Sequence, residues 1–295
     1  MAETVAVIGL GRMGAPMARN LMAGGHTLVV HDIRPEASAP FAADGVRVAA
    51  SPAEATTGAG IVLTCLPGPE HVVAVMEGAE GVLGAAQKGT LVIETSTIGP
   101  GQSRELSQRF AARGAAYLDA PLSGGVEGAM AGTLTIMVGG DEVAYERARA
   151  LFECLGTDLH HMGPSGAGNT MKLIIQMIFM SQVTAFLEGV ALGEAAGIEL
   201  DRLLDIIATS SAHHPTIAKR YDKILAGDLT PRFEVSSALK DLTLASAMGA
   251  EHGLNTLITN ASIEAAERTT ALGLGDKDLI ALRAGYGGGV RDGGG

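Results

Sequence analysis

Two kinds of hydrophobic pattern alternate along the first half of the chain. Short uninterrupted apolar runs are typical of buried strands, and apolar residues three or four apart are typical of helices. The predicted strands are Val5–Ile8, Leu28–His31, Val46–Val48, Ile61–Thr64, Leu91–Glu94, Ala116–Asp119, Leu134–Val138 and Asp158–His161. Helices are predicted at Arg12–Met22, from Pro52, and at Pro69–Met76, Gly101–Arg113 and Glu142–Leu155. This alternation predicts a Rossmann-type, doubly wound α/β fold with a parallel sheet.

The strand pattern stops at Gly163, and helical periodicity follows. Helices are predicted at Asn169–Ala196, Leu200–Thr209, Thr216–Leu225, Phe233–Gly249 and Thr256–Leu272. Because 295 residues are long for one hydrophobic core, we predict two domains. These are an α/β domain over residues 1–163 and an all-α domain over residues 164–295, which begins with a long interdomain helix. The glycine-rich stretch 285–295 is expected to be a flexible tail.

The composition favours a globular protein and argues against a nucleic-acid-binding protein. Apolar residues make up 47% of the chain, enough for sizeable cores, whereas aromatic residues make up 3%. The formal net charge is −11 and lysine and arginine form no run, so no nucleic-acid partner is expected. Cys65 and Cys154 form no CxxC pair, which predicts reduced thiols in a cytosolic protein and no metal site.

No targeting or membrane segment is expected. The N-terminus has no basic region before its first strand, so a signal peptide is not predicted. The most apolar span, Leu173–Leu192, contains Gln176, Gln182 and Glu188, which a membrane helix tolerates poorly. We therefore predict a soluble, cytoplasmic protein.

A glycine-rich loop, GLGRMG, separates the first predicted strand from the first helix. Its spacing is G-x-G-x-x-G, in which the first glycine allows a tight turn and the second lets backbone approach a pyrophosphate. The third glycine lets the helix pack closely on the strand, and the helix N-terminus attracts phosphate. We expect the whole loop to contact a dinucleotide, through Gly9, Leu10, Gly11, Arg12, Met13 and Gly14.

An acidic residue stands at the end of the second predicted strand. Asp32 lies about 20 residues beyond the glycine loop, where a carboxylate binds the hydroxyls of the adenosine ribose. A carboxylate at this point repels the 2′-phosphate of NADP, so NAD is the predicted cofactor. Arg34 lies two residues further on and has the charge to hold that phosphate, which leaves NADP possible.

Three further loops follow predicted strands, where ligands bind in open α/β sheets. Ser123, Gly124 and Gly125 supply a hydroxyl and unobstructed N–H groups, which suit a carboxylate but also occur in ordinary loops. Leu66-Pro67 follows the fourth predicted strand, and Thr97 follows the fifth. Leu66-Pro67 would border a ribose of the cofactor, and Thr97 would contact its nicotinamide end, but from the residues alone each loop is interpreted as a helix cap or turn.

A lysine lies near the start of the most apolar predicted helix. Asn169, Lys172 and Gln176 fall at i, i+3 and i+7 on one stripe, which then becomes apolar. A lysine paired with a core carboxylate would explain this pattern, but a polar pocket at the domain junction explains it better. Lys240 lies beside Asp241 on a later predicted helix, where a surface Lys–Asp pair is an equally good interpretation.

Four spaced motifs give the chain a resemblance to the β-hydroxyacid dehydrogenase family, which includes 3-hydroxyisobutyrate dehydrogenase and 2-hydroxy-3-oxopropionate (tartronate semialdehyde) reductase. The motifs are VIGLGRMGAPMARNL, DAPLSGG, GAGNTMKLIIQ and LKDLTLA, in the family's order over nearly the whole chain. The resemblance implies a Rossmann-type domain and an all-α domain that helps to build a homodimer or homotetramer. It also implies an NAD(P)-dependent interconversion of a small carboxylate-bearing β-hydroxy acid and its semialdehyde.

The same resemblance implies roles for individual residues. They are Lys172 as the catalytic acid/base, Ser123, Gly124 and Gly125 as the segment that holds the substrate carboxylate, and Thr97 and Lys240 as cofactor contacts. Apolar surroundings would lower the pKa of a lysine from about 10.4 toward neutrality, as a proton acceptor requires. The amides of Asn169 and Gln176 are then expected to orient the lysine or the substrate hydroxyl.

One position departs from the family pattern. The family usually has asparagine four residues after the lysine, where this chain has Gln176, one methylene longer. His213 and His214 lie in a predicted loop of the second domain and either shape specificity or lie on the surface. The resemblance therefore leaves the substrate open.

Two other functions share this architecture. An imine reductase-like NADPH enzyme is one alternative, although such relatives typically have Asp or Tyr where this chain has Lys172. A non-catalytic NAD-sensing protein is the other, although it would have no need of Lys172, Ser123 and Lys240 together.

Overall fold

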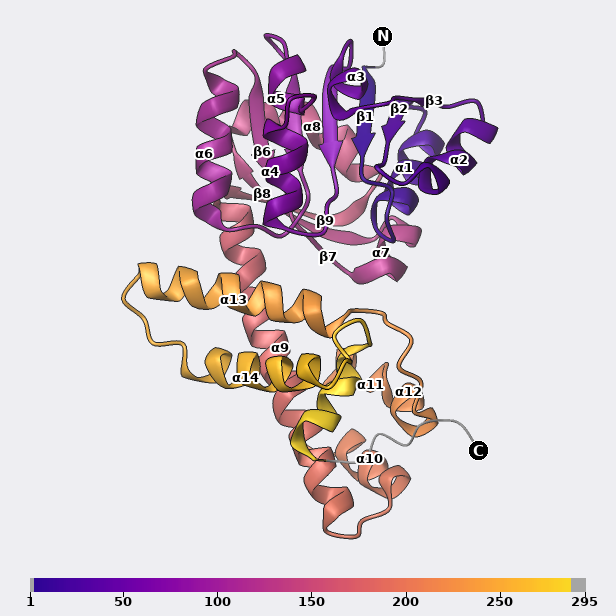
Figure 1. Cartoon of the computed structure of the whole chain (residues 1–295), viewed down its shortest axis with the longest axis vertical. Helices are drawn as coiled ribbons and strands as arrows, with labels where there is room; N and C mark the ends of the chain where they lie inside the picture. The colour runs from indigo at the N-terminus through magenta and orange to yellow at the C-terminus, as the bar shows by residue number, and fades with distance from the viewer. Residues whose placement is uncertain (1–2, 288–295) are drawn as a thin grey trace. The chain divides into compact units, whose positions relative to one another are not determined.

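The computed structural model describes residues 3–287 of the chain, which divide between Lys172 and Leu173 into two compact units (Figure 1). The first unit is α/β and the second is all-helical. The division lies within the long helix α9 (Ala167–Ala195). The predicted fold class, an α/β domain followed by a long helix and an all-α region, is confirmed.

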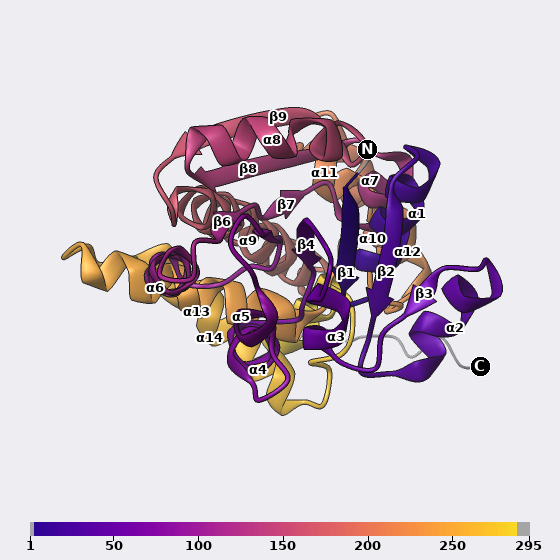
Figure 2. The ribbon, with the colours of Figure 1, turned by 90° about the horizontal axis from the view of Figure 1, so that it is seen from above.

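One sheet organises the first unit (Figure 2). Over the described residues its strands are β1 (Thr4–Ile8), β2 (Thr27–His31), β3 (Arg47–Val48), β4 (Ile61–Thr64), β5 (Leu91–Glu94), β6 (Ala116–Asp119), β7 (Leu122–Ser123), β8 (Leu134–Gly140) and β9 (Gly156–Gly163). Their order is β3-β2-β1-β4-β5-β6-β8-β7, and β9 pairs with β8. The order reverses between β1 and β4, so the loops after these strands flank the point where doubly wound sheets bind ligands.

Helices cover both faces of this sheet. They are α1 (Gly14–Ala23), α2 (Pro35–Ala43), α3 (Pro52–Thr56), α4 (Pro69–Glu77), α5 (Val82–Ala85), α6 (Pro100–Ala111), α7 (Gly125–Ala131) and α8 (Glu142–Glu153). Side chains alternate along β1, so Val5 and Val7 belong to the core that contains Met17 of α1. Ala6 and Ile8 belong to the opposite core, with residues of α4 and α6. The two cores explain why the central strands are apolar at consecutive positions.

The prediction of an entirely parallel sheet is wrong at one edge. The strands β1 to β6 are parallel, but β8 runs antiparallel to β6 and to β7. Leu122 and Ser123 pair with Ile136 and Thr135, and α7 connects the two strands, so β8 runs back along β6. A parallel pairing would have needed a crossover over the face of the sheet.

Helices of the second unit pack around the rest of α9. They are α10 (Leu200–Ala208), α11 (Pro215–Ala218), α12 (Tyr221–Ala226), α13 (Val235–Glu251), α14 (Leu257–Ala271) and the 3₁₀ helix η1 (Leu279–Tyr286). Met180, Val183, Leu187 and Val190 recur at helical spacing on α9 and enter one core with residues from α10, α13 and η1. The tail predicted over residues 285–295 begins inside η1, and residues 288–295 lie outside the described part of the chain.

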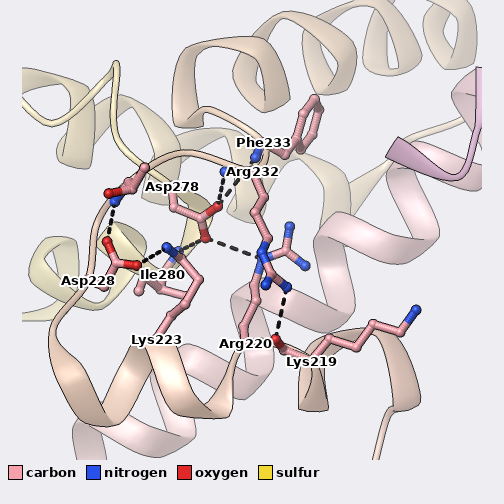
Figure 3. A network of polar contacts seen from close by, with 9 residues as sticks. Lys219, Arg220, Lys223, Asp228, Arg232, Phe233, Asp278 and Ile280 are labelled. Atoms are coloured by element: carbon pink, nitrogen blue, oxygen red, sulfur yellow. Dashed lines mark hydrogen bonds and ion pairs between the residues drawn. The ribbon is translucent and has the colours of Figure 1, made fainter. Parts of the chain in front are cut away.

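The predicted helix Thr216–Leu225 is broken in two, α11 and α12, at Arg220. The Arg220 guanidinium pairs with the fully buried carboxylate of Asp278 at 3.2 Å, next to the start of η1 (Figure 3). The same carboxylate accepts hydrogen bonds from the backbone N–H groups of Arg232 (2.8 Å), Phe233 (3.3 Å) and Ile280 (3.3 Å). This tertiary network overrides the local preference for one continuous helix.

Within the described residues, α9 is the helix long and apolar enough to cross a membrane, with a mean hydropathy of 1.6. Length and composition alone do not separate a membrane span from a core helix. Buried polar side chains at Asn169, Lys172 and Gln176 interrupt its apolar surface, and Met180 to Val190 line a core. These features are those of a core helix.

Candidate active site

The glycine loop lies between β1 and α1, at the switch point of the sheet. A Cβ atom on Gly14 would overlap the carbonyl oxygen of Gly9, and one on Gly9 would overlap that of Cys65. These two positions therefore require glycine. A Cβ on Gly11 would meet nothing within 4 Å, so a ligand can approach the backbone there. The loop has the form of a pyrophosphate cradle in front of a helix N-terminus.

Asp32 is fixed against this loop. Its carboxylate accepts hydrogen bonds from the backbone N–H of Leu10 at 2.7 Å and of Arg34 at 2.9 Å, and from Arg34 Nε at 3.2 Å. Burial raises the pKa of Asp32, but these hydrogen bonds together outweigh burial and hold the pKa below its usual range. The carboxylate is therefore ionised at neutral pH and held beside the cradle.

The loops after β4 and β5 are tied together by a fully buried acid, Glu94. Thr64 Oγ1 donates to Glu94 at 2.7 Å, and the Ser96 N–H donates to it at 2.6 Å. The Leu66 N–H in turn donates to Ser96 Oγ at 2.8 Å. The segments that carry Leu66-Pro67 and Thr97, both predicted cofactor contacts, are thus held as one hydrogen-bonded unit.

The thiol of Cys65 lies in the same region. Burial raises the pKa of Cys65 to about 12, despite a hydrogen bond with Thr95 that lowers it. The thiol therefore stays neutral at physiological pH. A neutral thiol is neither a nucleophile nor a metal ligand, and the described part of the chain shows no cluster of metal-ligating side chains.

The loop predicted to hold a carboxylate follows β7. Ser123 pairs with Thr135 in the sheet, Gly124 caps α7 and Gly125 is the first residue of that helix. Both glycines are exposed and have positive φ, at 131° and 65°. A hydroxyl and two accessible backbone positions therefore lie at one end of the sheet, as the carboxylate interpretation requires.

Lys172 lies in the second turn of α9 and is 9% exposed. It belongs to the same compact unit as the glycine loop, Asp32 and the loop at Ser123. The turn before it is held by buried Asn169, whose Oδ1 accepts from the Ile98 N–H at 3.1 Å. The structure thus places a largely buried ammonium group in the nucleotide-binding unit.

Gln176 and Lys240 lie in the second unit and share one partner, Asp241. Gln176 Nε2 donates to Asp241 Oδ2 at 2.6 Å, and Lys240 Nζ lies 2.9 Å from Asp241 Oδ1. Asp241 is 3% exposed, so the interpretation as a surface Lys–Asp pair is wrong. His213 is exposed, whereas His214 is partly buried with its ring 6.3 Å from that of Phe179.

Sequence reasoning missed two buried acids, Glu94 and Asp119, and the burial of a third, Asp241. Two of them end strands of apolar sequence, at β5 and β6. A carboxylate at the end of an otherwise apolar strand was the signal in the sequence that could have indicated these acids. Such a carboxylate is expected to be buried and therefore to need hydrogen-bond partners.

Comparisons with known proteins agree with this arrangement. Residues 4–163 match the NAD binding domain of 6-phosphogluconate dehydrogenase, and residues 166–284 match the NAD-binding family of NADP-dependent 3-hydroxyisobutyrate dehydrogenase. The 2-(hydroxymethyl)glutarate dehydrogenase of Eubacterium barkeri is 33% identical over 279 residues, 94% of this chain and 93% of that protein. The NAD-dependent L-serine dehydrogenase of Pseudomonas aeruginosa is 43% identical over 209 residues, 71% of this chain and 70% of that protein.

Solved structures show the same similarity. The 3-hydroxyisobutyrate dehydrogenase of Mycobacterium tuberculosis, solved with L-serine, matches with a TM-score of 0.83 and 34% identity, over 96% of this chain and 99% of that one. An imine reductase from Myxococcus stipitatus is more distant, at 20% identity and a TM-score of 0.65, and shares the fold alone.

The residues fit a dinucleotide at the cradle, with open backbone at Gly11 and an ionised carboxylate at Asp32. The cofactor is therefore NAD or NADP, and the enzyme is an oxidoreductase that acts on CH–OH groups of hydroxy acids. With both halves matched by its family models and full-length relatives above 30% identity, the chain belongs to the β-hydroxyacid dehydrogenase family.

Proposed function

We propose that this enzyme interconverts a small β-hydroxy acid and its semialdehyde with NAD, and that Lys172 transfers the proton. The observation that carries the proposal is the burial of Lys172, 9% exposed, in the unit that holds the glycine loop. A lysine side chain is rarely buried to this extent unless it is paired or has a catalytic task.

Each part of the reaction has a proposed residue. When bound, the nicotinamide supplies or accepts the hydride. During oxidation the Lys172 amine takes the proton of the substrate hydroxyl, and during reduction its ammonium returns a proton to the developing alkoxide. Ser123, Gly124 and Gly125 bind the substrate carboxylate, which fixes the carbon that faces the cofactor. Thr97, Leu66-Pro67 and Lys240 are proposed cofactor contacts.

The names of three relatives support the proposed substrate class. The names 2-(hydroxymethyl)glutarate, 3-hydroxyisobutyrate and L-serine share a CH₂OH group on the carbon that bears a carboxylate. We propose the same group for this chain, in a substrate of the 3-hydroxyisobutyrate or 2-hydroxy-3-oxopropionate type. Gln176, whose amide donates to Asp241, is proposed to influence substrate specificity. We also propose a cytoplasmic homodimer or homotetramer.

A substrate panel tests this function. The purified enzyme is assayed for NAD⁺ reduction with 3-hydroxyisobutyrate, glycerate, 3-hydroxypropionate and L-serine, and for NADH oxidation with 2-hydroxy-3-oxopropionate. At least one should be turned over much faster than 4-hydroxybutyrate, whose hydroxyl is one carbon too far from its carboxylate. Activity with cyclic imines and NADPH instead would favour an imine reductase, and NAD binding without any turnover would favour a sensor.

Asp32 is expected to set the preference for NAD over NADP. In Asp32→Ser, the ratio of kcat/KM for NAD⁺ to that for NADP⁺ should fall by roughly 10–100-fold, because a charge-assisted hydrogen bond is lost and a repulsion is removed. Arg34, whose side chain is 56% exposed, is then released from its ion pair and available to the 2′-phosphate. Adding Arg34→Ala should reverse part of the gain with NADP⁺, and an unchanged ratio in Asp32→Ser would contradict the assignment.

The contribution of Asp32 to the affinity for NAD⁺ should not vary with pH near neutrality. The pKa of Asp32 in the folded protein lies below its ordinary value, so the carboxylate is fully ionised above the ordinary value of about 3.9. Its contribution disappears only as the pH falls through the lowered pKa. Dissociation constants for NAD⁺ measured between pH 6 and 8 check this, with Asp32→Ser as the reference.

A further inference from the structure

The carboxylate of Asp119 anchors the start of α9. Asp119 ends β6, is fully buried, and accepts hydrogen bonds from the backbone N–H of Gly166 at 2.7 Å and of Asn169 at 2.9 Å. Each of its two oxygens takes one of these N–H groups. The first N–H groups of a helix lack intrahelical partners and carry partial positive charge, so a carboxylate holds them strongly. Asp119 therefore fixes the N-terminal end of α9 against the sheet.

The contact between α9 and the sheet is unusually close. A Cβ atom on Gly168 would overlap the backbone carbonyl oxygens of Met137 in β8 and Asp119 in β6. The first turn of α9 thus lies directly on strand backbone, with no side chain between them. Strand backbone cannot move aside as a flexible side chain can. A larger residue at Gly168 would therefore displace the whole first turn of α9.

Asn169 joins the same turn to the loop after β5. Its Oδ1 accepts from the Ile98 N–H, and its Nδ2 donates to Ser103 Oγ, each at 3.1 Å. Ile98 directly follows Thr97, and Lys172 lies three residues, about one helical turn, after Asn169. One fully buried side chain therefore connects the segment proposed to contact the cofactor with the helix that carries Lys172.

We propose that Asp119 and Asn169 are positioning residues that set where the Lys172 amine lies relative to the loop at Thr97. The inference rests on the proposed function, in which Lys172 takes the hydroxyl proton while hydride leaves the adjacent carbon. Both transfers must fit one substrate geometry, and misplacement by about 1 Å can cost 10²-fold in rate. Asn169 then acts through its protein contacts to orient the lysine, which is one of the two roles expected from the sequence, the other being a contact with the substrate hydroxyl.

The test uses the full-length enzyme with Asp119→Asn and Asn169→Ala. Steady-state kinetics are measured with the best substrate of the panel and with the same compound deuterated at its carbinol carbon. Both variants should lose roughly 10–100-fold in kcat while KM for NAD⁺ changes less than about threefold. The deuterium isotope effect on kcat should increase, because the misplaced chemical step then limits the rate.

Asp141→Asn is the matched control. Asp141 caps α8 by accepting the Ala144 N–H at 3.0 Å, the same chemistry at a helix of the same unit. Its kinetics should stay at wild-type values. Circular dichroism and thermal melting establish that each variant is folded, and Asn169→Ala carries the test if Asp119→Asn does not fold.

The outcomes separate this inference from the proposed function. Folded variants that keep kcat within about twofold of wild type, or lose kcat with an unchanged isotope effect, overturn the inference. Lys172→Ala is assayed alongside them. An inactive Lys172→Ala beside a fully active Asn169→Ala refutes the positioning role alone, whereas a fully active Lys172→Ala refutes both proposals.

Discussion

Lys172→Ala is expected to lower kcat by about 10²–10⁴-fold, the usual contribution of a positioned acid or base. The loss should appear with every substrate of the panel and in both directions, because each direction needs the same proton transfer. KM for NAD⁺ should stay near the wild-type value, since Lys172 is not among the proposed cofactor contacts, which are the glycine loop, Asp32, Leu66-Pro67, Thr97 and Lys240. Initial rates with NAD⁺ at saturating substrate measure the effect.

Two variants sharpen this result. Lys172→Arg keeps the positive charge but cannot exchange a proton near neutrality, so it should be nearly as slow as Lys172→Ala. Lys88→Ala removes an exposed lysine of the same unit and should be fully active. A Lys172→Ala enzyme that keeps more than about a tenth of wild-type kcat would remove Lys172 from the proton transfer.

The pH dependence gives an independent check of the same role. Oxidation requires the neutral amine of Lys172, so wild-type kcat/KM for oxidation should rise with pH. Reduction requires its ammonium form, so kcat/KM for reduction should fall with pH. In Lys172→Ala both dependences should flatten. An unaltered pH profile in that variant would assign the titrating group elsewhere.

The central strands of the fold were predictable because they are buried on both faces. Such strands are continuously apolar, and Ile61–Thr64, Leu91–Glu94 and Ala116–Asp119 have the bounds predicted from the sequence. The glycine loop was predictable for a related reason, since its steric requirement is local to the turn between β1 and α1.

Features that depend on distant partners were not predictable. The helix α2 begins at Pro35 and contains Pro40, so its sequence lacked a helical pattern. The direction of β8 is set by its pairing with β7, and the break at Arg220 by an ion pair with Asp278. No local pattern of hydrophobic residues reports such pairings.

The same distinction applies to the candidate site. The stripe of Asn169, Lys172 and Gln176 was visible in the sequence, but the partners of its amides were not. Asn169 contacts Ile98, 71 residues away, and Gln176 contacts Asp241, 65 residues away. The sequence therefore predicted the stripe, and the structure shows which protein groups its two amides contact.

Asp278→Ala is expected to lower the free energy of unfolding of the helical unit by about 3–5 kcal/mol. The substitution would leave the Arg220 guanidinium, 8% exposed as a residue, buried without this counter-charge. It would also remove the acceptor of three backbone N–H groups, at Arg232, Phe233 and Ile280 (Figure 3). Because unpaired buried donors are costly, η1 and the segment before α13 should loosen together.

Urea titration followed by far-UV circular dichroism measures the loss, and two variants define its cause. Asp278→Asn keeps the shape and one acceptor oxygen, so its loss should be smaller than that of Asp278→Ala. Asp276→Ala removes a nearby carboxylate whose side chain is 72% exposed and paired with Lys277, and it should leave the midpoint nearly unchanged. If Asp278→Ala and Asp276→Ala unfold at the same urea concentration, losing the buried ion pair costs no more than losing the exposed one. That result would contradict a role of the Asp278 network in holding η1.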